Sequence, residues 1–141
     1  MTSVTLRLDI VSAERELFSG EAEVIFVTGA LGDLGIHPGH APLITSLKPG
    51  NVRAILPNKQ EEIFYVSSGM LEVQPFIVTV LADTALRAHD IDEAAAREAK
   101  ERAEKLLEGK ITEVDFAKAT AELAEAIAQI SAIQQLKKRS K

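Results

Sequence analysis

The sequence predicts an α+β fold, with an N-terminal antiparallel β-sandwich of about ten strands followed by a C-terminal antiparallel two-helix hairpin. Short segments rich in Val, Ile, Phe and Tyr follow one another through the first part of the chain, with turn-forming residues between them. From Asp90 onward the turn formers become rare, and apolar residues recur every three or four positions. We therefore expect two domains, residues 1–88 and residues 89–141.

The strands are identified by alternation and composition. Residues 4–10 alternate Val, Leu and Ile with polar residues, as a strand with one buried face does. Further segments of strand composition lie at residues 22–29, 51–56, 61–68, 69–75 and 76–83. Turn formers separate them, among them Pro49-Gly50, Ser68-Gly69 and Gln74-Pro75. Because no helix intervenes, the segments favour an antiparallel sandwich or barrel.

Two helices are predicted, at about residues 91–108 and 113–136. Asp90 and Glu93 have the spacing of a capping box, and Thr112 with Asp115 forms a weaker one at the second helix. Gly109 supplies a residue that can adopt the left-handed conformation at the end of the first helix. The short connection makes the helices antiparallel neighbours.

The predicted contact between the helices is a seam of small residues. It is formed by Ala96, Ala99, Ala103 and Leu106 facing Phe116, Thr120, Leu123, Ile127 and Ile130. At about 0.8 kcal/mol per buried methylene, such a seam stabilises the closed hairpin by only a few kcal/mol. A hairpin that can open and a hairpin that permanently covers the sandwich both fit this pattern. Exposed faces carry pairs such as Glu93–Arg97, which we interpret as a solvated surface.

Composition excludes several classes of function. The net charge of −5 gives no attraction for nucleic acid or for an anionic membrane. No apolar run reaches the roughly 18 residues of a membrane span, so we expect no direct lipid insertion. The chain has no cysteine, which excludes disulfides and thiolate catalysis. The expected partners are proteins.

The segment from Gly32 to Gly50 carries the most unusual pattern. His37-Pro38-Gly39-His40 fits a type II turn, which brings two histidines close together. Zinc prefers at least three protein ligands, and Asp33 is the one carboxylate in the segment, so we expect no metal site. Neither a Gly-x-Ser-x-Gly elbow nor a phosphate-binding glycine loop is present, and we predict no catalytic residues. A basic end, which includes Lys137, Lys138 and Arg139, is either a solubilising tail or a contact for an acidic partner surface.

Three stretches carry a resemblance to a known family. They read LDIVSAERELFSG, VTGALGDLGIHPGHAPLITSLKPG and SGMLEVQPFIVTVLADTA, in this order and followed by the alanine-rich hairpin. Over nearly the whole chain they resemble the epsilon subunit of bacterial-type F-type ATP synthases. The resemblance implies a non-catalytic subunit of the central stalk, without an active site of its own. Its sandwich would link the gamma subunit to the ring of c subunits at the cytoplasmic face of the bacterial inner membrane.

The resemblance also implies roles for individual residues. Asp33 matches a position that faces the c ring, and His40, Ser12 and Thr45 match positions on the gamma side. The hairpin would extend toward the alpha and beta subunits and inhibit ATP hydrolysis. The residues of this inhibitory arm would be Leu123, Ile127, Ile130, Lys137, Lys138 and Arg139.

One departure from the family concerns nucleotide. Nucleotide-sensing members carry Ile/Leu-Asp-x-x-Arg-Ala at the start of the first helix, and this chain has the degenerate version Ile91, Asp92, Ala95 and Ala96, with alanine in place of arginine. Arg97 lies two residues further on, about 200° around the helix, and does not substitute simply. We expect no cofactor and, at most, weak binding of ATP.

Overall fold

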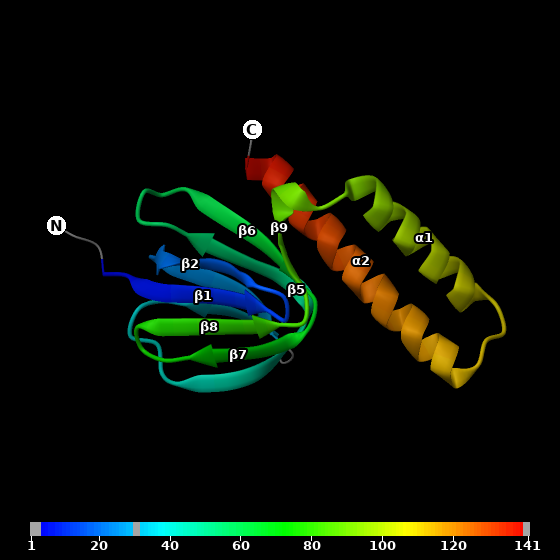
Figure 1. Cartoon of the computed structure of the whole chain (residues 1–141), viewed down its shortest axis with the longest axis horizontal. Helices are drawn as coiled ribbons and strands as arrows, with labels where there is room; N and C mark the ends of the chain where they lie inside the picture. The colour runs from blue at the N-terminus through cyan, green and yellow to red at the C-terminus, as the bar shows by residue number, and fades with distance from the viewer. Residues whose placement is uncertain (1–3, 30–31, 140–141) are drawn as a thin grey trace.

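The computed structural model describes residues 4–29 and 32–139, which form a β-sandwich followed by a helical hairpin (Figure 1). The predicted fold class is confirmed. Within the described residues the elements are β1 Leu6–Ser12, β2 Glu16–Ala22, β3 Val24–Gly29, β4 Gly32–Ile36, β5 Leu43–Ile55, β6 Glu61–Val66, β7 Gly69–Val73, β8 Ile77–Ala82, β9 Ala85–Arg87, the 3-10 helix η1 Ala88–Asp90, α1 Glu93–Glu108 and α2 Glu113–Arg139.

The long strand β5 belongs to both layers of the sandwich. Its first half, Leu43–Leu47, pairs with β7, and its second half, Gly50–Ile55, pairs with β6. The strand order is β2-β1-β8-β7-β5-β3-β4, with β6 beside β5 and β9 beside β6. The predicted turn at Pro49-Gly50 is wrong, because both residues lie inside β5. Gly50 approaches β3 so closely that a Cβ there would be 2.7 Å from the Cβ of Thr28, which explains the glycine.

One pair of strands departs from the antiparallel arrangement. β1 and β8 run parallel, whereas the other pairs among the described strands are antiparallel. The turn after β1 returns β2 along one edge of β1, and β8 occupies the other edge. Side chains of both layers meet between them and form the core, which includes Leu8, Ile10, Ile25, Val52, Phe64, Leu71 and Val80.

The helices occupy the predicted residues to within three positions. The first begins at a different cap, because Asp92 accepts a hydrogen bond from the backbone N–H of Ala95 (3.1 Å), and this replaces the predicted capping box. At the second helix the Thr112 hydroxyl accepts from the N–H of Asp115 (3.1 Å), as predicted. Gly109 is extended (φ −96°, ψ 178°) and not left-handed.

The hairpin is attached to the sandwich along the second half of α2. Ala128 and Ala132 pack with Ile63 and Tyr65 on the outer face of β6, and Ala88 of η1 completes this cluster. The main packing partner of α1 is α2. Figure 1 shows α1 and the first half of α2 projecting beyond the sandwich. The two helices therefore depend on the sandwich to different degrees.

Candidate docking segment and helical arm

The docking segment, residues 32–50, is held rigidly at its central turn. Gly39 has φ +87°, and the N–H of His40 donates to the carbonyl of His37 (3.1 Å). This geometry agrees with the predicted type II turn. The N–H of Gly39 also donates to the carbonyl of Pro75 (2.6 Å), which fixes the turn against the loop between β7 and β8.

The two histidines of this turn have different environments. His37 is exposed, whereas His40 is half-buried and its Nδ1 lies 2.7 Å from the carbonyl of Ala41. A carbonyl only accepts, so Nδ1 of His40 carries the proton in this contact. Within residues 4–29 and 32–139, no three His, Cys, Asp or Glu side chains lie close enough together to hold a metal ion.

The residues expected at the docking surfaces do not form one cluster. A row of paired residues crosses the sheet from Ser12 on β1, through Leu47 on β5, to Gly32 on β4. Ser12, Thr45 and the exposed Asp33 lie on this row or within two residues of it. Three strand spacings separate Ser12 from Thr45, which is roughly 15 Å. His40 lies beyond the start of β5, away from this row. A partner that contacts Ser12 and His40 together must therefore extend from one end of these strands to the other.

Exposed apolar side chains lie on the outer surface of the layer formed by β1, β8, β7 and β5, which is the side of β5 opposite to Thr45. Ile44 is 66% exposed, and other large apolar residues follow on the neighbouring strands and turn. They are Met70, Phe76, Ile77 and Leu81. A shallow groove of about 580 Å³ runs beside Ile44, between Pro42 and Gln74. Clustered apolar exposure of this kind is typical of a surface that another protein covers.

A second hollow joins the docking segment to α2. It has a volume of about 310 Å³, and its lining includes Asp33, Asn51, Arg53 and Gln135. The Asn51 side-chain amide donates to the hydroxyl of Ser131 on α2 (3.1 Å). The Arg53 guanidinium pairs with Glu61 at 3.3 Å. Strand β5 thus contacts α2 through the hydrogen bond of Asn51 with Ser131, and Arg53 joins it to β6.

The helical arm, residues 93–139, has a different seam from the one predicted. Ala96 and Ala103 of α1 are buried, as expected, but Leu106, Phe116 and Ile127 are about half-exposed, and Leu123 is only partly buried. The buried residues of α2 are Ala119, Ala126, Ala128, Ile130, Ala132 and Ile133. The prediction was wrong for the exposed residues because α2 must serve both α1 and the sandwich. The side chains of Phe116 and Ile127 therefore lie between the two packed faces of α2 and remain exposed to solvent.

Tyr65 fixes α2 to the sandwich. Its side chain is 1% exposed. Burial raises the pKa of Tyr65 to about 12, Glu125 of α2 adds to the rise, and a hydrogen bond with Gln129 of α2 opposes it. The neutral hydroxyl is therefore the form that suits the closed arm.

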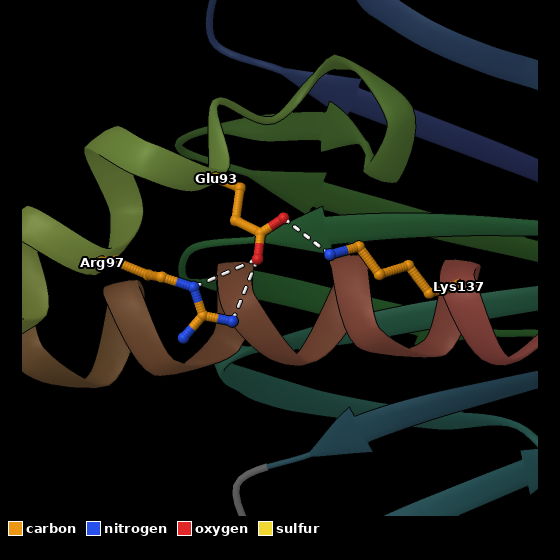
Figure 2. Close-up of polar contacts among 3 residues, drawn as sticks. All are labelled: Glu93, Arg97 and Lys137. Atoms are coloured by element: carbon orange, nitrogen blue, oxygen red, sulfur yellow. Dashed lines mark hydrogen bonds and ion pairs between the residues drawn. The ribbon is translucent and has the colours of Figure 1, made fainter.

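A charged contact, which we call the clasp, joins the beginning of α1 to the end of α2 (Figure 2). Glu93 Oε2 accepts from Nε and Nη2 of Arg97 at 3.1 and 3.0 Å, and Glu93 Oε1 accepts from Nζ of Lys137 at 2.9 Å. Lys137 and then Arg97 lower the pKa of Glu93. The sequence indicated the pair with Arg97, but not the contact with Lys137. Lys138 is exposed, and the side chain of Arg139 lies outside the described residues.

The residues of the degenerate nucleotide motif have structural roles. Ile91 packs against the cluster beneath α2, and Asp92 caps α1. Ala95 is exposed, and Ala96 is buried in the seam. The carboxylate of Asp92 is thus already used by the backbone of α1.

Comparisons with known proteins agree with this architecture. Residues 5–88 match the family model described as ATP synthase, Delta/Epsilon chain, beta-sandwich domain, and residues 89–134 match the corresponding long alpha-helix domain. The chain is 58% identical over 137 residues to an ATP synthase epsilon chain of Nitrosococcus oceani, covering 97% of this chain and 98% of the relative. It therefore belongs to the ATP synthase delta/epsilon chain family. The resemblance to the bacterial-type epsilon subunit is confirmed, and with it a place in the central stalk of that enzyme complex.

Solved structures share the fold. A chain of the Euglena gracilis mitochondrial ATP synthase (OSCP/F1/c-ring, rotational state 1) superposes with a TM-score of 0.82 at 18% identity, covering 92% of this chain and 81% of the other. A chain of the Tetrahymena thermophila mitochondrial ATP synthase central stalk and c-ring gives 0.62 at 12% identity, covering 94% and 99%. No helix in the described part of the chain is long and apolar enough to cross a membrane.

Proposed function

We propose that this chain is a non-catalytic rotor subunit that links gamma to the c ring and inhibits ATP hydrolysis by extending its helical arm. The observation that carries the proposal is the unequal attachment of the two helices. The main packing partner of α1 is α2, through a seam of small residues, whereas α2 is also attached to β5 and β6. Because a seam of small residues buries little apolar area, the closed and extended states should differ in free energy by only a few kcal/mol.

The docking segment supports the link to the rotor. A turn that is closed by its own hydrogen bond and bonded to the loop after β7 loses little further freedom when a partner binds it. The gamma subunit would cover the apolar face beside Ile44 and reach Ser12, Thr45 and His40. Asp33, exposed on the edge strand β4, would meet polar loops of the c ring. The subunit would be held at the cytoplasmic face of the inner membrane through these proteins, without inserting into lipid.

The arm would act on the alpha and beta subunits when extended. Leu123, Ile127 and Ile130 would then exchange their present surroundings for apolar partners on gamma. Ile127 is already 48% exposed in the closed arm, so only part of this stripe must be uncovered. The basic end, Lys137 to Arg139, would meet acidic segments of the catalytic subunits. The proposal assigns no cofactor to this action.

The test is the ATPase rate of the reconstituted catalytic head with the full chain and with a chain that lacks residues 131–141. We expect the truncation to raise hydrolysis while the sandwich remains bound to gamma. Truncation also uncovers Ile63 and Tyr65, so a second variant neutralises the basic end with Lys137→Gln, Lys138→Gln and Arg139→Gln and keeps the apolar cover. Partial relief of inhibition by this variant supports an inhibitory role of the arm, because exposed ion pairs contribute only modestly to binding of the catalytic subunits. Unchanged hydrolysis with both chains bound would show that the hairpin is a structural cover.

A further inference from the structure

We propose that Glu93 is an internal competitor for the basic end of the arm, and that its contact with Lys137 sets how readily the arm opens. The inference rests on the proposed function, since it assumes that the arm opens. It adds a residue that holds the closed state and a charge that must be released before Lys137 can meet an acidic partner.

The position of the clasp makes it a closure for the whole hairpin. Glu93 is the first residue of α1, directly after the cap at Asp92, and Lys137 follows 44 residues later near the end of α2. One ion pair therefore joins the two ends of the arm (Figure 2). Separation of the helices at this end must break it.

The pair is accessible enough to be exchanged. The side chains of Lys137 and Glu93 are 64% and 33% exposed. Water reaches both groups, so release of Lys137 does not leave a buried charge without a partner. A carboxylate on another protein can replace Glu93 at similar cost. A deeply buried pair would have resisted that exchange.

Arg97 prepares the carboxylate for this role. Arg97 donates to Glu93 from the next turn of the same helix, and this pair does not depend on α2. Glu93 is thus held in place by Arg97 whether the arm is open or closed, and the contact with Lys137 is the one that changes. The shared carboxylate lowers the entropic cost of reforming the clasp.

The inference predicts opposite effects for the two ends of the clasp. Glu93→Gln frees Lys137 and leaves the basic end intact, so inhibition of ATP hydrolysis should increase. Lys137→Gln breaks the same contact but also removes a charge needed in the extended state, so inhibition should decrease. In the isolated chain both changes should favour opening to a similar extent, roughly two- to fivefold for an exposed pair, and the double variant should add little.

The experiment measures opening in the isolated full-length chain and inhibition in the reconstituted complex. The chain has no cysteine, so Glu104→Cys and Lys118→Cys, both on exposed positions of the two helices, accept spin labels whose separation reports the closed arm. Glu98→Gln, which removes the same charge from an exposed position of α1, is the matched control. We expect the open fraction to rise with Glu93→Gln, not with Glu98→Gln, and the difference to shrink in high salt.

The outcomes separate this inference from the proposed function. If the open fraction is unchanged by Glu93→Gln, or changes equally with Glu98→Gln, the clasp is overturned even when truncation of the arm relieves inhibition. If the label distances change as expected but Glu93→Gln weakens the inhibition of ATP hydrolysis in the reconstituted complex, the proposal that Glu93 competes for the basic end is overturned. If no variant of the arm alters hydrolysis, the proposed function fails, whereas the label distances still decide whether the clasp closes the hairpin.

Discussion

Overpacking the seam of the arm is the most direct perturbation of the closed state. Ala103 is fully buried on α1, whose main partner is α2. Replacement by Leu adds three carbon atoms where the packed seam has no room for them, which destabilises the closed arm by about 1–3 kcal/mol. That range lowers the ratio of closed to open arm roughly 5- to 150-fold. Leu is nearly as good a helix former as Ala, so α1 keeps its intrinsic helicity.

Hydrogen exchange in the isolated chain measures this effect. With Ala103→Leu, backbone amides of α1 and the first half of α2 should exchange faster, whereas those of the sandwich core should not, because α2 is attached to β6 through other residues. Ala94→Leu and Ala117→Leu, at exposed positions of the two helices, are the matched controls. In the reconstituted complex Ala103→Leu should strengthen inhibition. Unchanged exchange in α1 would refute the claim that the alanine seam limits opening, and faster exchange throughout the sandwich would refute the independence of the two parts.

Three further predictions address the sandwich, the attachment of α2 and nucleotide. Because the raised pKa of Tyr65 favours the neutral hydroxyl, its stabilisation is present below pH 10 and is lost as the pH rises through 12, by about 1 kcal/mol at pH 11. The free energies of unfolding of the chain and of Tyr65→Phe, both measured by urea denaturation, should therefore diverge over this range. Gly69→Ala should cost at least about 3 kcal/mol, since Gly69 has φ +153° and a Cβ would lie 1.9 Å from the carbonyl oxygen of Leu81, while Gly35→Ala, whose Cβ would meet Phe26 at 3.6 Å, should change the denaturation midpoint little. The unmodified chain should bind ATP weakly or not at all in calorimetry, and Ala95→Arg should tighten binding; equal affinity of the two chains would reject the role given to the missing arginine.

The fold class could be predicted because strand-like alternation is strong in the N-terminal part of the sequence and helical periodicity is strong in the C-terminal part. Residues 4–10 and 76–83 are rich in β-branched residues, and both regions form strands. Strands β2 and β4 were missed because Gly, Ser and Asp on their exposed faces look like turns. The continuity of β5 through Pro49-Gly50 was missed for the same reason, since a proline and a glycine at a bend share the composition of a loop.

The candidate site was less predictable because it depends on contacts between distant residues. The apolar stripe of α2 was read as one seam, but the helix packs against α1 and the sandwich on different faces. The contact of Lys137 with Glu93 spans 44 residues, and periodicity carries no information at that range. The turn at His37–His40 was predictable because proline and glycine restrict the backbone locally, whereas the position of Ser12 far from His40 follows only from the strand order.

The continuity of β5 has a mechanical consequence. Seven residue steps of this thirteen-residue strand, roughly 23 Å of backbone, separate Ile44 beside the groove from Asn51, whose amide donates to Ser131 of α2. The first half of the strand is hydrogen-bonded to β7 and the second to β3 and β6. A force applied through a partner bound at the groove would therefore be carried along this hydrogen-bonded strand to the place where α2 is attached. Under the proposed function, twisting of a bound partner and release of α2 would both act on this one strand.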